Sequence, residues 1–237
     1  MFTTLHFIWL AISIVFIGGM TLLAVKCKFS LKVASLIMVG ICLLSEISKM
    51  MSDMEPNIDG GMSLSPKSLP FHLCSLMIFV VFYIAFAKDN AFKQRLINFL
   101  AVIGVIGSFC ALIIPTVGVR FDEIGPYQCF VYHAGLIWYS LYLIISKSAN
   151  LGLKNYFMNL IILASLAFIM IYVNGALSAY GTNFFYVVRP PMSNLPILNL
   201  DHGWYVYFIT LLVLGIILIT LFHLPFIIKE KKVQRKN

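Results

Sequence analysis

The sequence predicts an all-α, polytopic membrane protein with seven transmembrane helices, from its composition, its apolar runs and the charges of its loops. Of the 237 residues, 61% are hydrophobic and only 11% are charged. An average soluble domain is roughly 25% charged. A single globular core cannot bury so much apolar surface, so the chain falls in the membrane class, and one domain suffices for its length.

Seven apolar runs are long enough to cross a bilayer, which takes about 20 mostly apolar residues. They cover residues 6–25, 31–50, 69–87, 96–115, 127–146, 156–176 and 203–227. The first run has no Lys or Arg before Lys26 and no clear cleavage site, unlike a secretory signal peptide. We therefore expect a single seven-helix domain over residues 1–237, with a basic cytoplasmic tail at 229–237.

The charges between the runs give the orientation, because Lys and Arg collect on the cytoplasmic side of short loops. Thirteen of the 17 basic residues fall on one side, and seven of the nine acidic residues fall on the other. The basic side carries Lys26, Lys28, Lys32, Lys88, Lys93, Arg95, Lys147, Lys154 and the C-terminal KEKKVQRKN. We therefore expect an outside N-terminus, a cytoplasmic C-terminus and a location in the cell membrane. The net charge of +8 indicates contact with anionic inner-leaflet lipid and not with nucleic acid.

The longest predicted outer loop is YGTNFFYVVRPPMSNLPILNLDHG. Loops of this length are usually functional or disordered, and its aromatic residues argue against disorder. We expect it to fold as a partial lid on the outer face.

Chemically active side chains gather at one level, near the outer ends of the predicted helices. Cys74 is about five residues into the third run and His133 about six into the fifth, so both lie roughly 8–9 Å below the helix ends. Others at this level are Glu46, Lys49, Gln128, Cys129, Asn174 and His202. Ionisable groups are expensive within the bilayer and usually face a cavity. The pattern predicts one polar cavity that opens outward.

Some polar residues have purely structural alternatives. Glu46 precedes Lys49 by three residues, the spacing of an ion pair on a helix. His6 and His223 lie near the ends of their runs and are expected to be interfacial.

The cysteines and histidines also leave other chemistry open. A disulfide between Cys74 and Cys129 is an alternative in an oxidising setting. A metal or haem site is another, with His72, Cys74, His133 and His202 as its ligands.

Four stretches carry a resemblance to a known family: LPFHLCSL, YHAGLIWYSLY, YGTNFFYVVRPP and GWYVYF. With these stretches in this order, the chain resembles the bacterial YwaF-like family of seven-helix membrane proteins. That family is similar to the eukaryotic transmembrane protein 164 family. The eukaryotic relatives are described as phospholipid acyltransferases with an essential cysteine and histidine. The resemblance therefore implies an acyltransferase with Cys74 as nucleophile and His133 as base. In LDHGWYVYF, His202 departs from the bacterial pattern and is the alternative histidine.

A cysteine can accept an acyl group as a thioester and pass it to an alcohol or amine, with a histidine as proton carrier. His72 is two residues from Cys74, about 200° away on a helix, so we expect it to orient the start of the third helix. Supporting and oxyanion roles are expected of Asn174, Gln128 and Glu46, and substrate contacts of Arg120, Arg189, Tyr132 and Trp204.

The expected donor is a phospholipid, and the expected acceptor a lysolipid or a lipoprotein. No soluble-cofactor motif is present, so we expect no cofactor and no metal. The alternative function is that of a small-molecule binding or transport protein with an outward-facing polar pocket, which a chain without clear inverted repeats makes less favourable.

Overall fold

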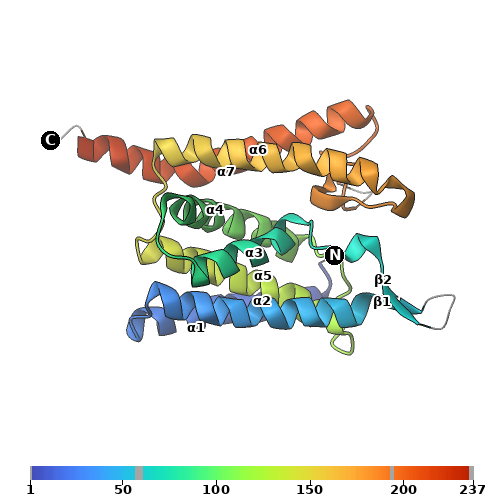
Figure 1. The fold of residues 1–237 in the computed structure, drawn as a ribbon, viewed down its shortest axis with the longest axis horizontal. Coiled ribbons are helices and arrows are strands. Elements are labelled where there is room, and N and C mark those ends of the chain that lie inside the picture. The colour runs from blue at the N-terminus through green and yellow to red at the C-terminus, as the bar shows by residue number, and fades with distance from the viewer. Residues whose placement is uncertain (1, 57–60, 193–194, 235–237) are drawn as a thin grey trace. The chain divides into compact units, whose positions relative to one another are not determined.

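The computed structural model describes residues 2–56, 61–192 and 195–234. In this part of the chain it contains seven α-helices (Figure 1). They are α1 (Thr4–Lys26), α2 (Leu31–Asp53), α3 (Leu73–Phe86), α4 (Ala91–Ile113), α5 (Ile124–Ile145), α6 (Leu153–Ala176) and α7 (Trp204–Gln234). All but α3 are long and apolar enough to cross a membrane, which makes this a multi-pass membrane protein. The outside N-terminus and cytoplasmic C-terminus stay a prediction.

Helix α3 is shorter than the run 69–87 from which it was predicted. It starts at Leu73, after a 3-10 turn at Pro66–Ser68, and its 14 residues rise about 21 Å. The hydrocarbon core is about 30 Å thick. Pro70 disfavours helical backbone at Leu69, and Phe71 and His72 pack edge-on against Phe184 instead of continuing the helix. A seventh full span therefore stays a prediction.

Helix α7 is longer than predicted, because the basic tail continues it to Gln234. Lys, Glu and Gln are good helix formers, so the end of the apolar run does not end the helix. Pro225 lies inside α7, where it removes one backbone donor. Residues 235–237 of the predicted tail lie outside the described residues.

A small β-ribbon follows α2 in a fold predicted to be purely helical (Figure 1). Strands β1 (Met54–Pro56) and β2 (Met62–Leu64) pair antiparallel, with Met54 opposite Leu64. Strands of three residues are too short to leave a recognisable alternation in the sequence.

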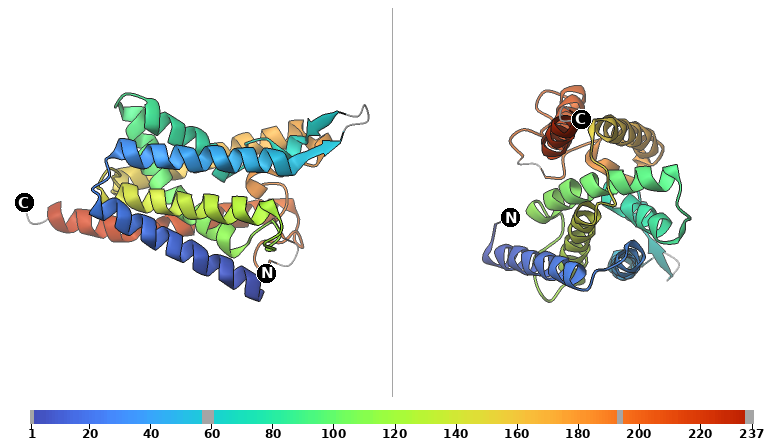
Figure 2. Two further views of the ribbon diagram at one scale, coloured as in Figure 1. Left: turned by 90° about the horizontal axis from the view of Figure 1, so that it is seen from below. Right: turned by 90° about the vertical axis from the view of Figure 1, so that its left-hand side faces the viewer.

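The chain folds into two compact units. The first comprises residues 1–70 and 74–149, and α5 is its central helix, which packs against α1, α2 and α4 (Figure 2). Small residues let the helices approach closely. A Cβ atom on Gly104 would lie 2.1 Å from Ser140 Oγ, and one on Gly135 would lie 3.1 Å from Ile41 Cγ2. Polar links reinforce the packing, as where Tyr139 Oη lies 2.6 Å from Ser35 Oγ.

The second unit comprises residues 71–73 and 150–237 and is built on the pair α6 and α7. Between these helices the chain forms 3-10 turns at Ser178–Tyr180 and Phe184–Tyr186. The Asn183 side chain accepts hydrogen bonds from the amides of Val188 and Arg189, and it donates to the Arg189 carbonyl. The described part of the predicted lid is therefore ordered by its own hydrogen bonds. Its role as a lid, like the single-domain organisation, stays a prediction.

Candidate functional site

Cys74 lies in the first turn of α3, as its second residue, and is half-buried. The sequence predicted it about five residues into the helix, but the late start of α3 moves it to the N-terminus. The first four N–H groups of a helix have no partner within the helix, and they make this end partly positive. An anion that develops at Cys74 would be stabilised by this environment.

Tyr132 joins this turn to α5. Its hydroxyl donates a hydrogen bond of 2.6 Å to the carbonyl oxygen of Cys74, and the ring is buried. His133 follows Tyr132 in the chain, so this bond places the start of α3 beside the part of α5 that carries the predicted base. His133 is the tenth residue of α5, which starts at Ile124 and not near residue 127, whereas Cys74 is the second of α3. The expected shared level of the two residues therefore stays a prediction.

His133 is buried in α5 and uses one ring nitrogen for its hydrogen bonds. Nδ1 lies 2.6 Å from the carbonyl oxygen of Cys129 and 3.6 Å from its sulfur. A carbonyl oxygen can only accept, so Nδ1 carries the proton and the lone pair of the neutral ring is on Nε2. Neither contact uses Nε2. His133 is therefore held in the tautomer that a general base needs.

The histidines of α1 and α7 were expected to be interfacial, and this is wrong. His6 and His223 are fully buried. In the first unit, His6 Nε2 lies 2.8 Å from the Leu112 carbonyl oxygen and Nδ1 accepts from the Phe2 amide. In the second unit, His223 Nδ1 lies 2.9 Å from the Leu151 carbonyl oxygen. Its Nε2 lies 3.1 Å from the amide nitrogen of Asn159. In each of these histidines both ring nitrogens make hydrogen bonds, so the side chain links parts of the fold.

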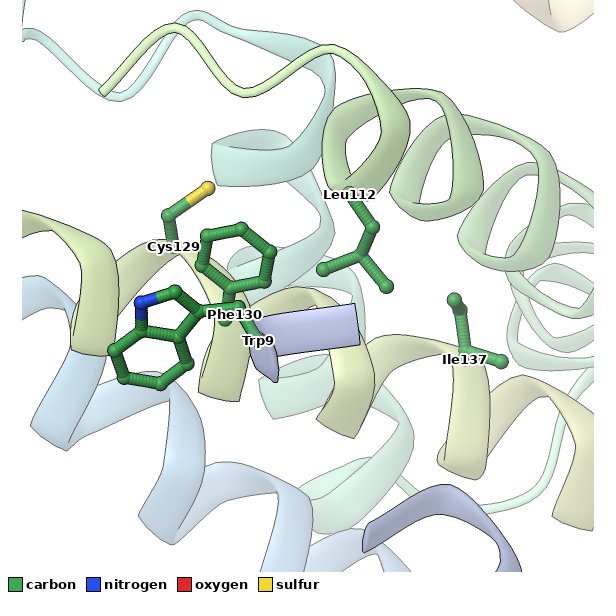
Figure 3. Packing of buried hydrophobic residues seen from close by; sticks show 5 residues of the cluster. All are labelled: Trp9, Leu112, Cys129, Phe130 and Ile137. Carbon is green, nitrogen blue, oxygen red and sulfur yellow. The ribbon is translucent and has the colours of Figure 1, made fainter. Parts of the chain in front are cut away.

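Cys129, which the sequence placed at this level as a possible disulfide partner, is the residue that contacts His133. It packs with Trp9 and Phe130, whose rings stack at 5.1 Å, in the core cluster drawn in Figure 3. The thiols of Cys129 and Cys74 are both free. The alternative disulfide is therefore not formed. The signal was present in the sequence, because Cys129 precedes His133 by four residues, one helical turn.

Two further predicted residues of the first unit, Gln128 and Glu46, have polar partners within it. Gln128 donates from Nε2 to Ser45 Oγ at 2.8 Å, across α5 and α2. Glu46 forms an ion pair of 2.7 Å with Lys49, as its structural alternative predicted.

Arg120 lies in the exposed segment between α4 and α5, where two carboxylates already balance its charge. Its guanidinium is 2.5 Å from Asp122 and 3.6 Å from Glu123. The hydrogen bond to Asp122 raises the pKa of Arg120, and the same bond holds the pKa of Asp122 below its ordinary value. This pairing does not favour the predicted phosphate contact.

The remaining predicted residues belong to the second unit. Asn174 is buried and donates to Met170 and Phe184 carbonyls, while its oxygen accepts from the Phe184 amide at 2.8 Å. Its amide thus anchors the loop after α6 and is not free to bind an oxyanion.

Four others lie in or near the loop that precedes α7. Arg189 donates to the Gly181 carbonyl, and Trp204 donates from Nε1 to the Val187 carbonyl at 2.9 Å. His202 is exposed, and His72 packs 5.5 Å from the Tyr186 ring. These contacts organise the loop.

Within the described residues of either unit, no three His, Cys, Asp or Glu side chains come together in a way that could hold a metal ion. The arrangement that remains is a thiol at a helix N-terminus, a tyrosine that holds its turn, and a buried histidine whose basic nitrogen is left for chemistry.

A family model described as the TMEM164 family matches residues 1–223 of the 237. No curated protein and no solved structure matches the chain.

Proposed function

Because the chain belongs to the TMEM164 family of membrane proteins, we propose that it is an acyltransferase that moves a fatty acyl chain from a phospholipid through a thioester on Cys74. The acceptor is a lysolipid or a lipoprotein. The observation that carries the proposal is the hydrogen bond from Tyr132 to the Cys74 carbonyl, next to His133 with its basic Nε2. It supports the nucleophile and base that the family resemblance implies.

The tautomer of His133 favours Cys74 over Cys129 as the nucleophile. The nitrogen beside the Cys129 sulfur carries a proton that is donated to a carbonyl, so it cannot accept one from that thiol. Nε2 has the lone pair and is left for a thiol on another helix. Tyr132 acts as a positioning residue, because it fixes the backbone of Cys74 and not its sulfur.

The reaction has two balanced halves. The Cys74 thiol gives its proton to His133 Nε2, and the sulfur attacks the ester carbonyl of the phospholipid. The ester C–O bond breaks, the oxygen of the lysophospholipid takes the proton from His133, and a thioester remains. In the second half, His133 takes the proton of the acceptor and the acceptor attacks the thioester. The C–S bond breaks, and the leaving Cys74 sulfur takes the proton back from His133.

The oxyanion of each step forms beside the first turn of α3. Its backbone N–H groups are directed at that end of the helix and lack intrahelical partners. Preorganised N–H donors are the usual means of stabilising such an oxyanion. We assign this role to the backbone of α3, since the amides of Asn174 and Gln128 already have partners.

The proposed site faces the outer leaflet of the cell membrane, as the loop charges predict. Reporter fusions after Leu153 and after Asn237 should both report cytoplasm. An outside signal at either position would contradict this orientation, although the chemistry of Cys74 could still be tested.

The test of the chemistry is covalent labelling of the purified chain in lipid vesicles that contain a phospholipid with an alkyne-tagged acyl chain. We expect a label that hydroxylamine removes, as it does a thioester. The label should disappear in Cys74→Ala and become slow in Cys74→Ser, because serine is a far poorer nucleophile.

Cys110→Ala and Cys129→Ala are the matched controls, since each removes another free thiol of the same unit. Both should keep the label. Full labelling and transfer in Cys74→Ala would exclude a thioester on Cys74, whereas no label and no transfer in the parent chain would favour the binding or transport alternative.

A further inference from the structure

A polar cavity of about 290 Å³ lies in the first unit, at the helix ends opposite the start of α3. It is formed where α2 begins, where α3 turns into α4, and where α5 ends. Its lining residues are Leu31, Asp89, Asn90, Lys93, Gln94, Ile97, Lys147 and Ser148. Cys74 lies at the other end of α3, about 20 Å away along the helix. The cavity is therefore separate from the candidate catalytic residues.

Lys93 is a buried cation in the wall of this cavity. The residue is only 8% exposed, and its ammonium donates to the Ala87 carbonyl and to Asp89, each at 2.9 Å. An ammonium has three donors, so one donor is left after these two contacts. The Asp89 side chain is 95% exposed, so solvent screens the carboxylate that lines the cavity.

Lys147 adds a second positive charge from the end of α5. It has a φ of 61°, a left-handed conformation in which glycine is usually found at the end of a helix. The amide of Ala149 closes the turn by donating to the Leu143 carbonyl at 2.9 Å. The two lysines against one carboxylate leave the lining with a net positive charge.

The neutral groups of the lining are mostly committed to the protein. Gln94 donates from Nε2 to Asn98 and to the Ser148 carbonyl, and Asn90 donates to the Lys88 carbonyl. The lysine ammonium groups are thus the strongest donors that remain for a ligand. Leu31 and Ile97 supply an apolar wall beside them.

We propose that this cavity binds a phosphate group, carried either by the headgroup of an anionic phospholipid or by a free phosphate ion. Lysine recognises phosphate as a point charge and makes charge-assisted hydrogen bonds to its oxygens. The volume accommodates a phosphoglycerol headgroup, and the apolar wall suits the start of its acyl chains.

The left-handed lysines provide the test variants. Lys147→Gly removes one charge from the cavity and relaxes the backbone, so a loss of binding cannot be attributed to strain. Lys28 also has a positive φ, of 50°, at the end of α1, and it does not line the cavity. Lys28→Gly is therefore a control matched in charge, backbone and helix position.

The experiment measures the thermal stability of the full chain in a neutral detergent as ligand is added, which gives an apparent Kd. The probes are dihexanoyl-phosphatidylglycerol, inorganic phosphate and, as the control without phosphate, dihexanoylglycerol. We expect Lys147→Gly and Lys93→Gln each to weaken phosphate-dependent binding about tenfold, as the loss of one charge-assisted hydrogen bond predicts. Lys28→Gly should stay within about twofold of the parent chain.

The titrations with lipid and with inorganic phosphate distinguish the source of the phosphate. Binding of the lipid that inorganic phosphate does not displace identifies a lipid headgroup, and lysine-dependent binding of inorganic phosphate itself identifies the free ion. Equal affinities for Lys147→Gly and Lys28→Gly, or equal binding of dihexanoylglycerol, would overturn the proposal. If Lys93→Gln fails to fold, the comparison of Lys147→Gly with Lys28→Gly still tests the proposal.

Discussion

Helices α5 and α7 each carry a buried histidine, but they use it differently. His133 of α5 bonds through Nδ1 to a carbonyl of its own helix, which leaves the lone pair of Nε2 for chemistry. His223 of α7 bonds through Nδ1 to the Leu151 carbonyl and through Nε2 to Asn159. Burial alone therefore does not distinguish the two histidines. They differ in whether Nε2 also makes a hydrogen bond within the fold.

The two helices also differ in what they pack against. Helix α5 packs against three helices of its unit, with glycines at the closest approaches. Helix α7 packs on α6, and its polar side chains tie the two helices together. Polar links occur in both units, but the first unit adds close helix packing at glycines, as at Gly104 and Gly135, whereas a Cβ atom on Gly215 of α7 would meet only ordinary contacts.

The largest expected effect comes from His133→Asn. An asparagine amide occupies the place of Nδ1 and can still donate to the Cys129 carbonyl, but it has no base at the place of Nε2. Acyl transfer should fall by about 10²-fold or more, while thermal stability changes little. Transfer assays on Cys74→Ala, His133→Asn and the double variant should give similar residual rates, because a nucleophile and its base act as a unit.

Full activity in His133→Asn would remove His133 as the base. His202→Ala then becomes the next test, since His202 is the alternative histidine of the resemblance. His72→Ala should keep measurable activity in either case.

The reverse outcome is expected for His223→Ala. It leaves the Leu151 carbonyl and the Asn159 amide without their buried partner, which should lower the free energy of unfolding by about 2–4 kcal/mol. The rate of acyl transfer by the folded fraction should stay within about twofold. Unfolding titrations in mixed micelles measure the first quantity. His202→Ala, an exposed change in the same unit, is the control and should have no effect on stability.

The close packing of α5 is tested with Gly104→Ala. The new Cβ would lie 2.1 Å from Ser140 Oγ, which donates to the Leu100 carbonyl at 3.0 Å. We expect a loss of about 1–3 kcal/mol in the free energy of unfolding, partly restored by adding Ser140→Ala. Gly215→Ala in α7 has Leu163 no closer than 3.8 Å and should be neutral or stabilising. An equal loss at both glycines would contradict the contrast between the helices.

The sequence predicted the seven helices well because apolar runs mark membrane segments directly. It misplaced the ends of α3 and α7 and the start of α4, predicted at residue 96 and observed at Ala91 after the Asn90 cap, because apolarity does not report where a helix begins or ends. Pro70 and the ring contacts of Phe71 delay the start of α3, and helix-forming charged residues extend α7.

The contacts of the site residues were likewise predictable only where local spacing along the sequence determines them. The Glu46–Lys49 pair followed from local spacing. Counting residues placed Cys74 fifth and His133 sixth in their helices, but they are second and tenth, because the helices begin at Leu73 and Ile124. The role of Asn174 did not follow from local spacing, because its partner Phe184 lies in a loop without a pattern. The tautomer of His133 likewise depends on a hydrogen bond that only the folded backbone reveals.

A smaller effect is expected where α7 caps α6. Gly152 has no side chain to cap the helix, and the Glu230 carboxylate accepts from the Leu153 amide at 2.9 Å instead. Glu230→Ala should lower the free energy of unfolding by about 1 kcal/mol, the usual value of an N-cap. Glu230→Gln should keep part of that contribution. If neither variant changes stability in unfolding titrations, α7 does not support α6 in this way.

The smallest effect is expected in the exposed segment between α4 and α5. Because the bond from Arg120 holds the pKa of Asp122 below its ordinary value, the pair is intact at neutral pH and is lost as the pH falls through that lowered pKa. Arg120→Gln should therefore move the Asp122 titration upward, toward the value of a free aspartate, with little change in stability because solvent screens the pair. Carbon-13 NMR of aspartate-labelled protein in micelles would follow it among only five Asp signals, with Asp122→Asn for assignment. An unchanged titration in Arg120→Gln would show that the ion pair does not persist in solution, and Arg120 would again be free to contact a phosphate.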